Sequence, residues 1–525
     1  MAEPDSKDDT SIKHQPQQNP ITREKFNLLK EMVLEKKPIL REILEKRGKK
    51  TLAEYAKDYT DVNPDTYSSE RQDELITAIV KELNITITPE IAQSVANQLK
   101  KYYFVSTADH FGPICHPFFV NANLMACANY KNSGDKDLQN IVVLSCSNIS
   151  FDNSSFPRGL QFHSSQSGET KLYQLPLFSR IVRPYPVFNA KPFCLESINE
   201  ILKNIAQWHK NNEINETVKE KLEWLLNKIY LQSDVLACDV FADQISKTNL
   251  KIWQTFFGRH TAEMPNLIYI EQERLVTNLL IENHLNKPTI IHDILFNSEY
   301  HDYLEKYFDG IMGGFTLAEK KGTYLFWAFP PGSKYRQQLW KKDNFLITED
   351  ESYKIELIPS EIARALAAKE IFSSTLLSFI TLSFYYGLKL LGGFNQVNYL
   401  TEMKQAYKKF LEEIGSTKEI LFTENIQTKE LIDAPTVAFG RGRRNELIPA
   451  TGLDLFLYNN DETLNLLRKT LNSLTLEDAL MPLLPELYKV IYPEPQRDKQ
   501  LMEITSEDIT CLLHLDDKEE ACISI

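Results

Sequence analysis

The hydrophobic period of the chain changes near residue 101, and this change limits the fold more than any other feature. Residues 23–100 place apolar side chains at three- and four-residue steps, as at Phe26, Leu29 and Val33, which predicts amphipathic helices. After residue 101, apolar runs of strand length alternate with turn-rich segments, and residues 141–144 form the clearest run. A strand that is covered on both faces has this uninterrupted apolar character. We therefore predict an α/β fold around a mostly buried sheet.

The length of 525 residues exceeds what one compact core usually holds, so several segments are expected. They are a disordered tail at residues 1–22, a helical segment at 23–100, a first part of the α/β core at 101–194, a helical insertion or hairpin at 195–309, a second part of the core at 310–500 and an acidic tail at 501–525. Ile198, Ile201 and Ile205 share one helical face, which predicts long amphipathic helices in the insertion. Short apolar runs predict strands near residues 420–422 and 453–457.

Charge and cysteine content narrow the class of protein. The formal net charge of −13 argues against broad nucleic-acid binding, which needs a basic surface. Seven cysteines without regular spacing predict reduced thiols and a cytoplasmic location, and residues 1–22 lack the apolar core of a signal peptide. The apolar run at residues 375–391 is shorter than a membrane span and contains Lys389, so it predicts a buried core element. We expect neither a nucleic acid nor a membrane as a partner.

Reactive side chains are densest at residues 107–117, where glycine and proline predict a shaped turn. The segment contains Asp109, His110, Cys115 and His116. Three interpretations remain open: a zinc site, acid–base machinery, or a structural turn whose histidines bind backbone groups. We take His110, Asp109 and His116 as candidate catalytic residues and expect no protein-ligated metal.

A polar loop follows the predicted strand at residues 141–144, at the end where α/β sheets bind ligands. Asn148 opens this loop, and Arg158 can hold a carboxylate or phosphate through two parallel hydrogen bonds. Arg180 and Arg183 follow downstream and are candidates to complete an anion pocket. We predict substrate binding by Asn148, Arg158 and Arg180. A surface loop with a salt-bridged arginine is the alternative.

The most basic stretch of this acidic chain is a glycine–arginine loop. Its candidate residues are Gly440, Arg441, Gly442 and Arg443. The glycines let backbone amides approach an anion and the arginines add charge, so a phosphate or a nucleotide is the expected ligand. The loop lacks the lysine and hydroxyl pattern of a Walker loop, and an exposed basic loop is the alternative.

A second glycine turn leads into a predicted helix at residues 399–413. Gly392 and Gly393 form this turn, and Asn395 and Gln396 lie near the helix start, where unpaired backbone donors favour anions. We take the two glycines as nucleotide-binding candidates, and Asn395 and Gln396 as substrate-binding candidates. A plain turn-to-helix junction is the alternative.

The residues after this turn resemble a known family. The string Val-Asn-Tyr-Leu-Thr-Glu-Met-Lys-Gln-Ala-Tyr at residues 397–407 is similar to a helix start in the bacillithiol-biosynthesis cysteine-adding enzymes, which are cysteine ligases. Arg-Ala-Leu at residues 364–366 and the apolar run at residues 372–380 resemble further segments of that family, in the same order. The resemblance implies a Rossmann-like core with additional helices and a long α-helical, coiled-coil hairpin. It also implies ligase chemistry.

The resemblance implies a ligase-like enzyme that joins an amino-acid-like donor to an amine-bearing small acceptor through an amide, and we assign the candidate residues to that reaction. His110 and Asp109 would act as acid and base, and ATP or ADP is the expected nucleotide. Two other functions remain open. One is a catalytically silent interaction protein that keeps the fold, which the long charged helices fit, and the other is a zinc-dependent hydrolase. The sequence also leaves a homo-oligomer open.

Overall fold

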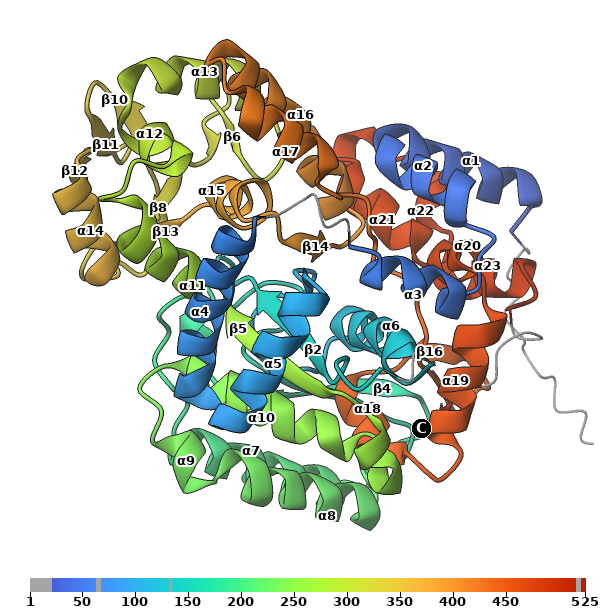
Figure 1. The fold of residues 1–525 in the computed structure, drawn as a ribbon. Helices are drawn as coiled ribbons and strands as arrows, with labels where there is room; N and C mark the ends of the chain where they lie inside the picture. Colours follow the sequence, from blue (N-terminus) through green and yellow to red (C-terminus); the bar gives the residue numbers. More distant parts are fainter. Residues whose placement is uncertain (1–20, 63–67, 133–134, 516–520) are drawn as a thin grey trace, which may run out of the picture.

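The structure is a computed structural model that describes residues 21–62, 68–132, 135–515 and 521–525 (Figure 1). The predicted disordered tail at residues 1–22 lies outside these residues, apart from Ile21 and Thr22. The Thr22 hydroxyl caps the first helix by accepting the Lys25 backbone N–H at 3.2 Å. The helices predicted over residues 23–100 are confirmed as α1 (Arg23–Lys36), α2 (Pro38–Arg47), α3 (Leu52–Thr60), α4 (Ser69–Thr86) and α5 (Pro89–Lys101).

A four-stranded parallel sheet forms the centre of a mixed α/β fold. Its strand order is β14 (Lys389–Leu391), β1 (Phe104–Ser106), β2 (Asn140–Ser145) and β5 (Asn266–Glu271). The apolar run at residues 141–144 lies in β2, so the predicted buried strand is confirmed. The sheet is compatible with a Rossmann-like core. β5 lies inside the segment 195–309, for which only helices were expected, and its apolar residues 267–270 are the missed signal.

The sheet is covered on both faces because successive side chains of a strand point in opposite directions. In β2, Ile141 and Val143 enter one hydrophobic core, whereas Val142 and Leu144 enter the other. The first core is completed by α3, α6 (Pro117–Asn132), α10 (Phe241–Thr255) and α18 (Gly452–Tyr458). The second is completed by α4, α5, α11 (Gln272–Leu279) and α16 (Gln396–Glu413). In Figure 1, α4 and α5 lie over β5 and β2, with which they are in contact.

The helices of the segment 195–309 pack on the body of the protein. They are α7 (Leu195–Lys210), α8 (Glu216–Leu225), α9 (Ser233–Leu236), α10, α11, α12 (Ile290–Phe296) and α13 (Ser298–Phe308). Ile198, Ile201 and Ile205 of α7 are buried in the first core. A long projecting hairpin is therefore not confirmed, although α7 and α8 do contact each other.

Small antiparallel sheets form a lobe at the upper left of Figure 1. The lobe contains β6 (Phe315–Thr316), β7 (Lys321–Gly322), β8 (Phe326–Ala328), β9 (Gln337–Gln338), β10 (Trp340–Lys342), β11 (Phe345–Ile347), β12 (Lys354–Glu356), α14 (Pro359–Ala367) and β13 (Ile371–Ser373). A two-stranded sheet of β3 (Gly159–Ser164) and β4 (Lys171–Pro176) lies outside this lobe.

The apolar run at residues 375–391 is a buried core element, as predicted. It forms α15 (Thr375–Phe379), a π-helical turn (Ile380–Tyr385) and strand β14. Ser378, Thr381 and Ser383 are fully buried within it. Among the described residues, no helix has both the length and the apolar character that crossing a membrane requires.

Two predicted strands are wrong, because residues 420–422 lie in α17 (Thr417–Asn425) and residues 453–457 in α18. A short apolar run has no period that distinguishes a strand from a helix, and α18 begins at a capping box between Thr451 and Asp454. The chain continues through α19 (Thr463–Ser473), α20 (Leu476–Leu480), α21 (Leu484–Ile491), α22 (Lys499–Met502) and α23 (Ser506–Leu512). The segment 501–525 ends in β17 (Ile523–Ser524), which pairs with β15 (Phe439–Arg441), itself paired with β16 (Leu447–Pro449).

Candidate active site

The loops after three parallel strands meet at one edge of the sheet. β1 continues through α6 to β2 on one side, whereas β14 lies on its other side and continues into α16. The chain therefore leaves neighbouring strands in opposite directions, which opens a crevice at their carboxyl ends. The Thr107 backbone N–H donates to the Leu391 carbonyl at 2.9 Å, so the loop after β1 and the loop after β14 begin side by side.

A cavity of about 380 Å³ occupies this crevice. Of the residues proposed from the sequence, it brings together His110, His116, Asn148, Gly393, Asn395 and Gln396. Its wall also contains residues that sequence reasoning missed, among them Thr107, Asn153, Ser155, Gln272, Thr375, Tyr399, Asp433 and Glu486. The cavity is lined by both apolar and polar side chains, as small-molecule sites commonly are.

His110 has a free lone pair on one ring nitrogen. Its Nδ1 lies 3.2 Å from Asn153 Oδ1, and that oxygen also accepts the Ser155 backbone N–H at 3.0 Å. Because Asn153 Oδ1 is thereby fixed as an acceptor, we assign the proton of neutral His110 to Nδ1. Burial lowers the pKa of His110, with partial compensation by the hydrogen bond to Asn153. The ring is therefore a neutral base whose Nε2 can accept a proton.

His116 has the opposite tautomer. Its Nδ1 accepts the Phe118 backbone N–H at 3.3 Å, so the proton of the neutral ring lies on Nε2. Burial, and secondarily the nearby His110 ring, lower the pKa of His116 to about 4. Both rings pack against Phe119, with centroids 5.5 and 5.4 Å from its centroid. The pair thus offers one acceptor and one donor at the same cavity.

Asp433 contributes a buried carboxyl group that sequence reasoning missed. The Gly392 N–H donates to Glu430 O at 3.0 Å, and Ile432 N–H donates to Gly392 O at 2.9 Å. This strand-like pairing beside the sheet positions Asp433 at the cavity wall, with a residue exposure of 7 %. Its Oδ1 is buried and has no hydrogen-bond partner among the residues that the structure describes.

The environment of Asp433 favours its protonated form. Burial, and secondarily the charge of Asp109, raise its pKa to about 8. The next residue, Ala434, has a φ of 113°, which residues with a side chain rarely adopt. Glu486 of α21 also lines the cavity, and burial raises the pKa of its carboxyl group. Strained backbone and carboxyl groups of raised pKa are typical of functional sites.

The glycine turn before α16 is shaped by close contacts. A Cβ on Gly392 would lie 2.6 Å from the Gln396 side chain, and a Cβ on Gly393 would lie 3.0 Å from Asp433 Oδ2. Gln396 Nε2 donates to the Thr107 hydroxyl at 2.5 Å, which joins the two loops. Asn395 occupies the N-cap position of α16, but its side chain forms no capping hydrogen bond, and its buried Oδ1 has no partner among the described residues. The turn therefore has a structural role and also leaves one amide oxygen available to a ligand.

Asn148 is held by a charged layer behind the cavity. Glu273 accepts the backbone N–H groups of Ser147 at 2.8 Å and Asn148 at 3.1 Å. Arg336 donates to the carbonyl and side-chain oxygens of Asn148. The Cys146 thiol donates to Glu273 at 3.3 Å, and burial followed by the charge of Glu273 raises its pKa well above the usual value. Cys146 is therefore a neutral thiol rather than a nucleophile.

Asp109 does not line the cavity, so the predicted pairing with His110 needs correction. Its Oδ2 accepts Asn123 Nδ2 at 2.9 Å and the Tyr269 hydroxyl, and its side chain is fully buried. Neighbouring residues of an extended segment point to opposite sides, so His110 faces the cavity while Asp109 faces the core. Burial raises the pKa of Asp109 to about 7 despite these hydrogen bonds. Cys115 is likewise buried, which raises its pKa to about 12.

The predicted arginine ligands lie elsewhere. Arg158 and Arg180 line a second cleft, so Arg158 does not join Asn148 in the cavity. Phe156 has a φ of 54°, and this turn separates the path of the chain at Arg158 from the strand-end loop. Gly440, Arg441, Gly442 and Arg443 belong to the β15–β16 hairpin and none of them lines the cavity.

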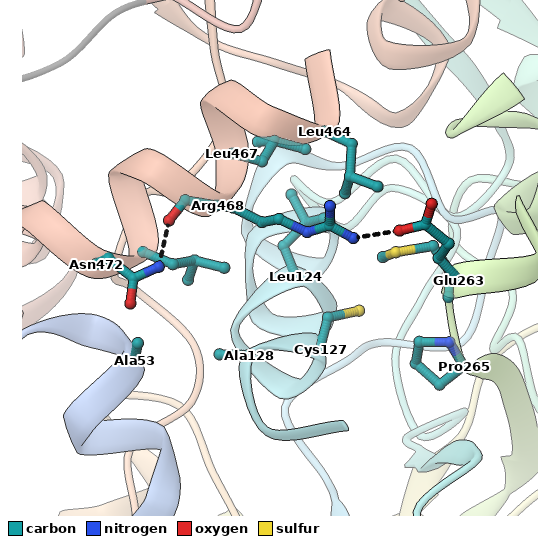
Figure 2. A pocket seen from close by; sticks show the side chains of 12 residues that line it. Ala53, Leu124, Cys127, Ala128, Glu263, Pro265, Leu464, Leu467, Arg468 and Asn472 are labelled. Atoms are coloured by element: carbon teal, nitrogen blue, oxygen red, sulfur yellow. Dashed lines mark hydrogen bonds and ion pairs between the residues drawn. The ribbon is translucent and has the colours of Figure 1, made fainter. Parts of the chain in front are cut away.

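A third hollow, of about 90 Å³, lies between α3, α6 and α19 (Figure 2). Its walls are largely apolar, as at Leu124 and Leu464, and Arg468 closes one side by pairing with Glu263 at 2.7 Å. Figure 2 also shows the Asn472 amide turned back to the Arg468 carbonyl. Its small volume and satisfied polar groups make it a packing defect rather than the main candidate site.

Within the described ranges, no three His, Cys, Asp or Glu side chains converge as ligands for a metal ion. The seven cysteines are free thiols. No protein-family model matches the chain, and no curated protein shows significant similarity to it.

Proposed function

We propose that the strand-end cavity is the active site of an enzyme that forms an amide bond between an amino-acid-like donor and an amine-bearing small acceptor. One observation carries the proposal: the cavity combines a neutral histidine base with a carboxyl group of raised pKa. His110 and Asp433 have environments that favour uncharged forms, which suits proton transfer near neutral pH. The resemblance of residues 397–407 to cysteine ligases supports the proposal. We propose a Rossmann-like core for the same reason.

The proposed reaction uses each group in the protonation state that its surroundings favour. The amine nitrogen of the acceptor attacks the carbonyl carbon of an activated carboxyl group, and His110 Nε2 accepts the amine proton. The His116 Nε2–H and the protonated Asp433 carboxyl group donate hydrogen bonds to the oxygen that gains negative charge. The new C–N bond forms as the C–O bond between the carbonyl carbon and the activating group breaks, and a phosphoryl or adenylyl activating group would leave as phosphate or AMP. Asp109 acts only as a positioning residue, because it lies beneath the loop.

Substrate selection is assigned to the polar groups that remain available at the wall. The unpartnered Asn395 Oδ1 is suited to the ammonium or amine hydrogens of a substrate. Gln272, which is almost fully buried beside the cavity, offers a further amide. ATP is the proposed source of carboxyl activation, and a cytoplasmic location is proposed because all seven thiols are free.

The test is a condensation assay with purified protein. ATP is supplied with pools of amino acids and of amines, including amino sugars, and products are identified by mass spectrometry as a donor plus an acceptor minus water. The wild-type protein should form such a product. The variants His110→Ala and Asp433→Asn should form far less while keeping the wild-type circular dichroism spectrum.

His209→Ala provides the matched control, because His209 lies on α7 and pairs with Glu216 at 2.9 Å, away from the cavity. It should keep wild-type activity. A product that His110→Ala forms at the wild-type rate would rule out this assignment of the base. Absence of any condensation product across the pools would favour the silent interaction protein.

A further inference from the structure

A second cleft, of about 370 Å³, gathers three arginines without a matching set of anions. Arg158, Arg180 and Arg183 line it together with Gln174. In the part of the chain that the structure describes, none of these three guanidinium groups forms an ion pair. The one carboxylate at the wall, Asp152, accepts a hydrogen bond from the Ser150 hydroxyl.

The arginines are brought together by backbone hydrogen bonds between separate segments. The short 3-10 turn at Arg180–Val182 is attached to the strand-end loop because Asp152 N–H donates to Arg183 O at 2.9 Å. The end of β4 is attached as well, since Leu177 N–H donates to Arg158 O at 2.8 Å. These hydrogen bonds fix the backbone segments that bear the three arginines relative to one another.

Among the described residues, Asp152 compensates only part of the charge repulsion between the arginines of the cleft. Burial, followed by the charges of Arg183 and Arg180, lowers the pKa of Arg158. Its guanidinium group lies 4.7 Å from the Phe156 ring centroid, which orients the planar group. Three cations facing one carboxylate leave a net positive charge that a dianion balances better than a single carboxylate does. Guanidinium groups also match the geometry of phosphate oxygens.

The cleft and the strand-end cavity share a wall. Asn153 and Ser154 line both of them. The same Asn153 side chain accepts from His110 Nδ1 at 3.2 Å, so one residue faces the cleft and orients the proposed base. A ligand that extends across this wall can place one end among the arginines and the other near His110.

We propose that the arginine cleft binds the phosphoryl group of a ligand whose remaining part enters the strand-end cavity across Asn153 and Ser154. Phosphate binding stands on the cleft alone, whereas the extension into the cavity rests on the proposed function. The phosphoryl group comes either from a nucleoside polyphosphate or from a phosphorylated small substrate. Both present the same anionic oxygens to the three guanidinium groups.

Calorimetric titration tests the cleft with orthophosphate, pyrophosphate, ATP and glucose 6-phosphate, at an ionic strength kept constant with chloride. Acetate is the carboxylate comparison. The wild-type protein should bind the phosphate probes saturably and acetate much more weakly. Tighter binding of pyrophosphate and ATP identifies a polyphosphate as the ligand, and tighter binding of glucose 6-phosphate identifies a phosphorylated substrate. Arg158→Ala and Arg183→Ala should each weaken phosphate binding by about tenfold.

Arg444→Ala is the matched control, since Arg444 is an exposed arginine that pairs with Glu169 at 2.9 Å and is not among the residues that line the cleft. It should bind phosphate as the wild type does. Equal affinity for phosphate in the Arg158→Ala/Arg183→Ala double variant, or no saturable binding by the wild type, would overturn phosphate binding in the cleft.

The extension into the cavity has its own readout. Asn395→Ala should weaken the larger phosphate probe that binds best, and should leave the affinity for orthophosphate unchanged. If neither ATP nor glucose 6-phosphate is affected by this substitution, the shared ligand is disproved while the phosphate cleft stands. His110→Ala should still bind orthophosphate normally, so a failed condensation assay and a failed cleft are distinguishable.

Discussion

The strand-end cavity and the arginine cleft share a wall but differ in how they treat charge. In the cavity, burial keeps His110, His116 and Asp433 in uncharged forms near neutral pH. In the cleft, arginines remain charged and partly or largely exposed. The difference indicates that the two sites have different roles. Buried groups of shifted pKa suit proton transfer, whereas uncompensated cations suit the capture of an anion.

The largest expected effect is the loss of activity in His110→Ala. A positioned base contributes roughly 10²- to 10⁴-fold to a rate, so the condensation rate should fall by a factor in that range. The rate is measured at saturating substrate, with His209→Ala as the comparison. A decrease smaller than about threefold would show that His110 is not the base, and the cavity would then have no assigned role in proton transfer.

Asp433→Asn should change the pH dependence of stability. The folded carboxyl group keeps its proton up to about pH 8, whereas the unfolded group, with an ordinary value of 3.8, loses it earlier. Its stabilising contribution is therefore full below that lower value and is lost as pH rises through about 8. The asparagine side chain does not ionise, so the variant lacks this loss. Between pH 3.8 and about pH 8, the free energy of unfolding of the variant relative to that of the wild type should therefore rise by up to about 1.4 kcal/mol per pH unit.

Urea unfolding at a series of pH values measures this difference. Asp343→Asn, in an exposed turn between β10 and β11, provides the control and should follow the wild-type profile. Parallel profiles for Asp433→Asn and the wild type would show that the Asp433 carboxyl group ionises normally.

Tyr269→Phe should destabilise the loop beneath the cavity. The Tyr269 hydroxyl donates to Asp109 Oδ2, and the fully buried Asp109 Oδ1 has no partner within the part of the chain that the structure describes. Removing a donor from a buried polar group costs about 1–3 kcal/mol. Thermal and urea denaturation measure the change, and the double variant with Asp109→Asn separates the pair from the single effects. Additive losses would contradict a direct interaction between Tyr269 and Asp109.

The smallest effect is expected for Arg183→Ala, which should change the free energy of unfolding by less than about 0.5 kcal/mol. At low salt the variant should be slightly more stable than the wild type, because one of three repelling cations is removed. The gain should disappear at about 0.5 M salt, where screening is strong. A marked loss of stability at low salt would show that Arg183 stabilises the fold and has a structural role instead of a ligand-binding role.

The sequence predicted the parts that follow from strand and helix periodicity. The buried run at residues 141–144 located β2, and the polar residues after it fell at the correct edge of the sheet. His110, Asn148 and Asn395 meet in one cavity because parallel strands end at the same edge. The proximity of these loops could therefore be inferred from the order of the strands alone, without knowing the contacts between them.

Other features depend on tertiary contacts that leave little local signal. Asp433 reaches the cavity through only a short pairing beside Gly392, too brief to show a strand period. Asp109 and His110 are neighbours in sequence, yet they face opposite sides of the loop. Arg158 was expected beside Asn148, but a turn at Phe156 directs it to the adjoining cleft. Adjacent sequence positions therefore predicted a shared loop but not a shared site.

The position of β14 has a consequence for synthesis on the ribosome. Lys389 of β14 pairs with Phe104 of β1, about 285 residues earlier in the chain. At roughly 5–20 residues per second, β1 waits on the order of 15–60 s with one edge unpaired. A nascent chain that stops before β14 would display that apolar edge. Holding chaperones should therefore associate most strongly with chains arrested between β5 and β14, and release them once β14 has emerged.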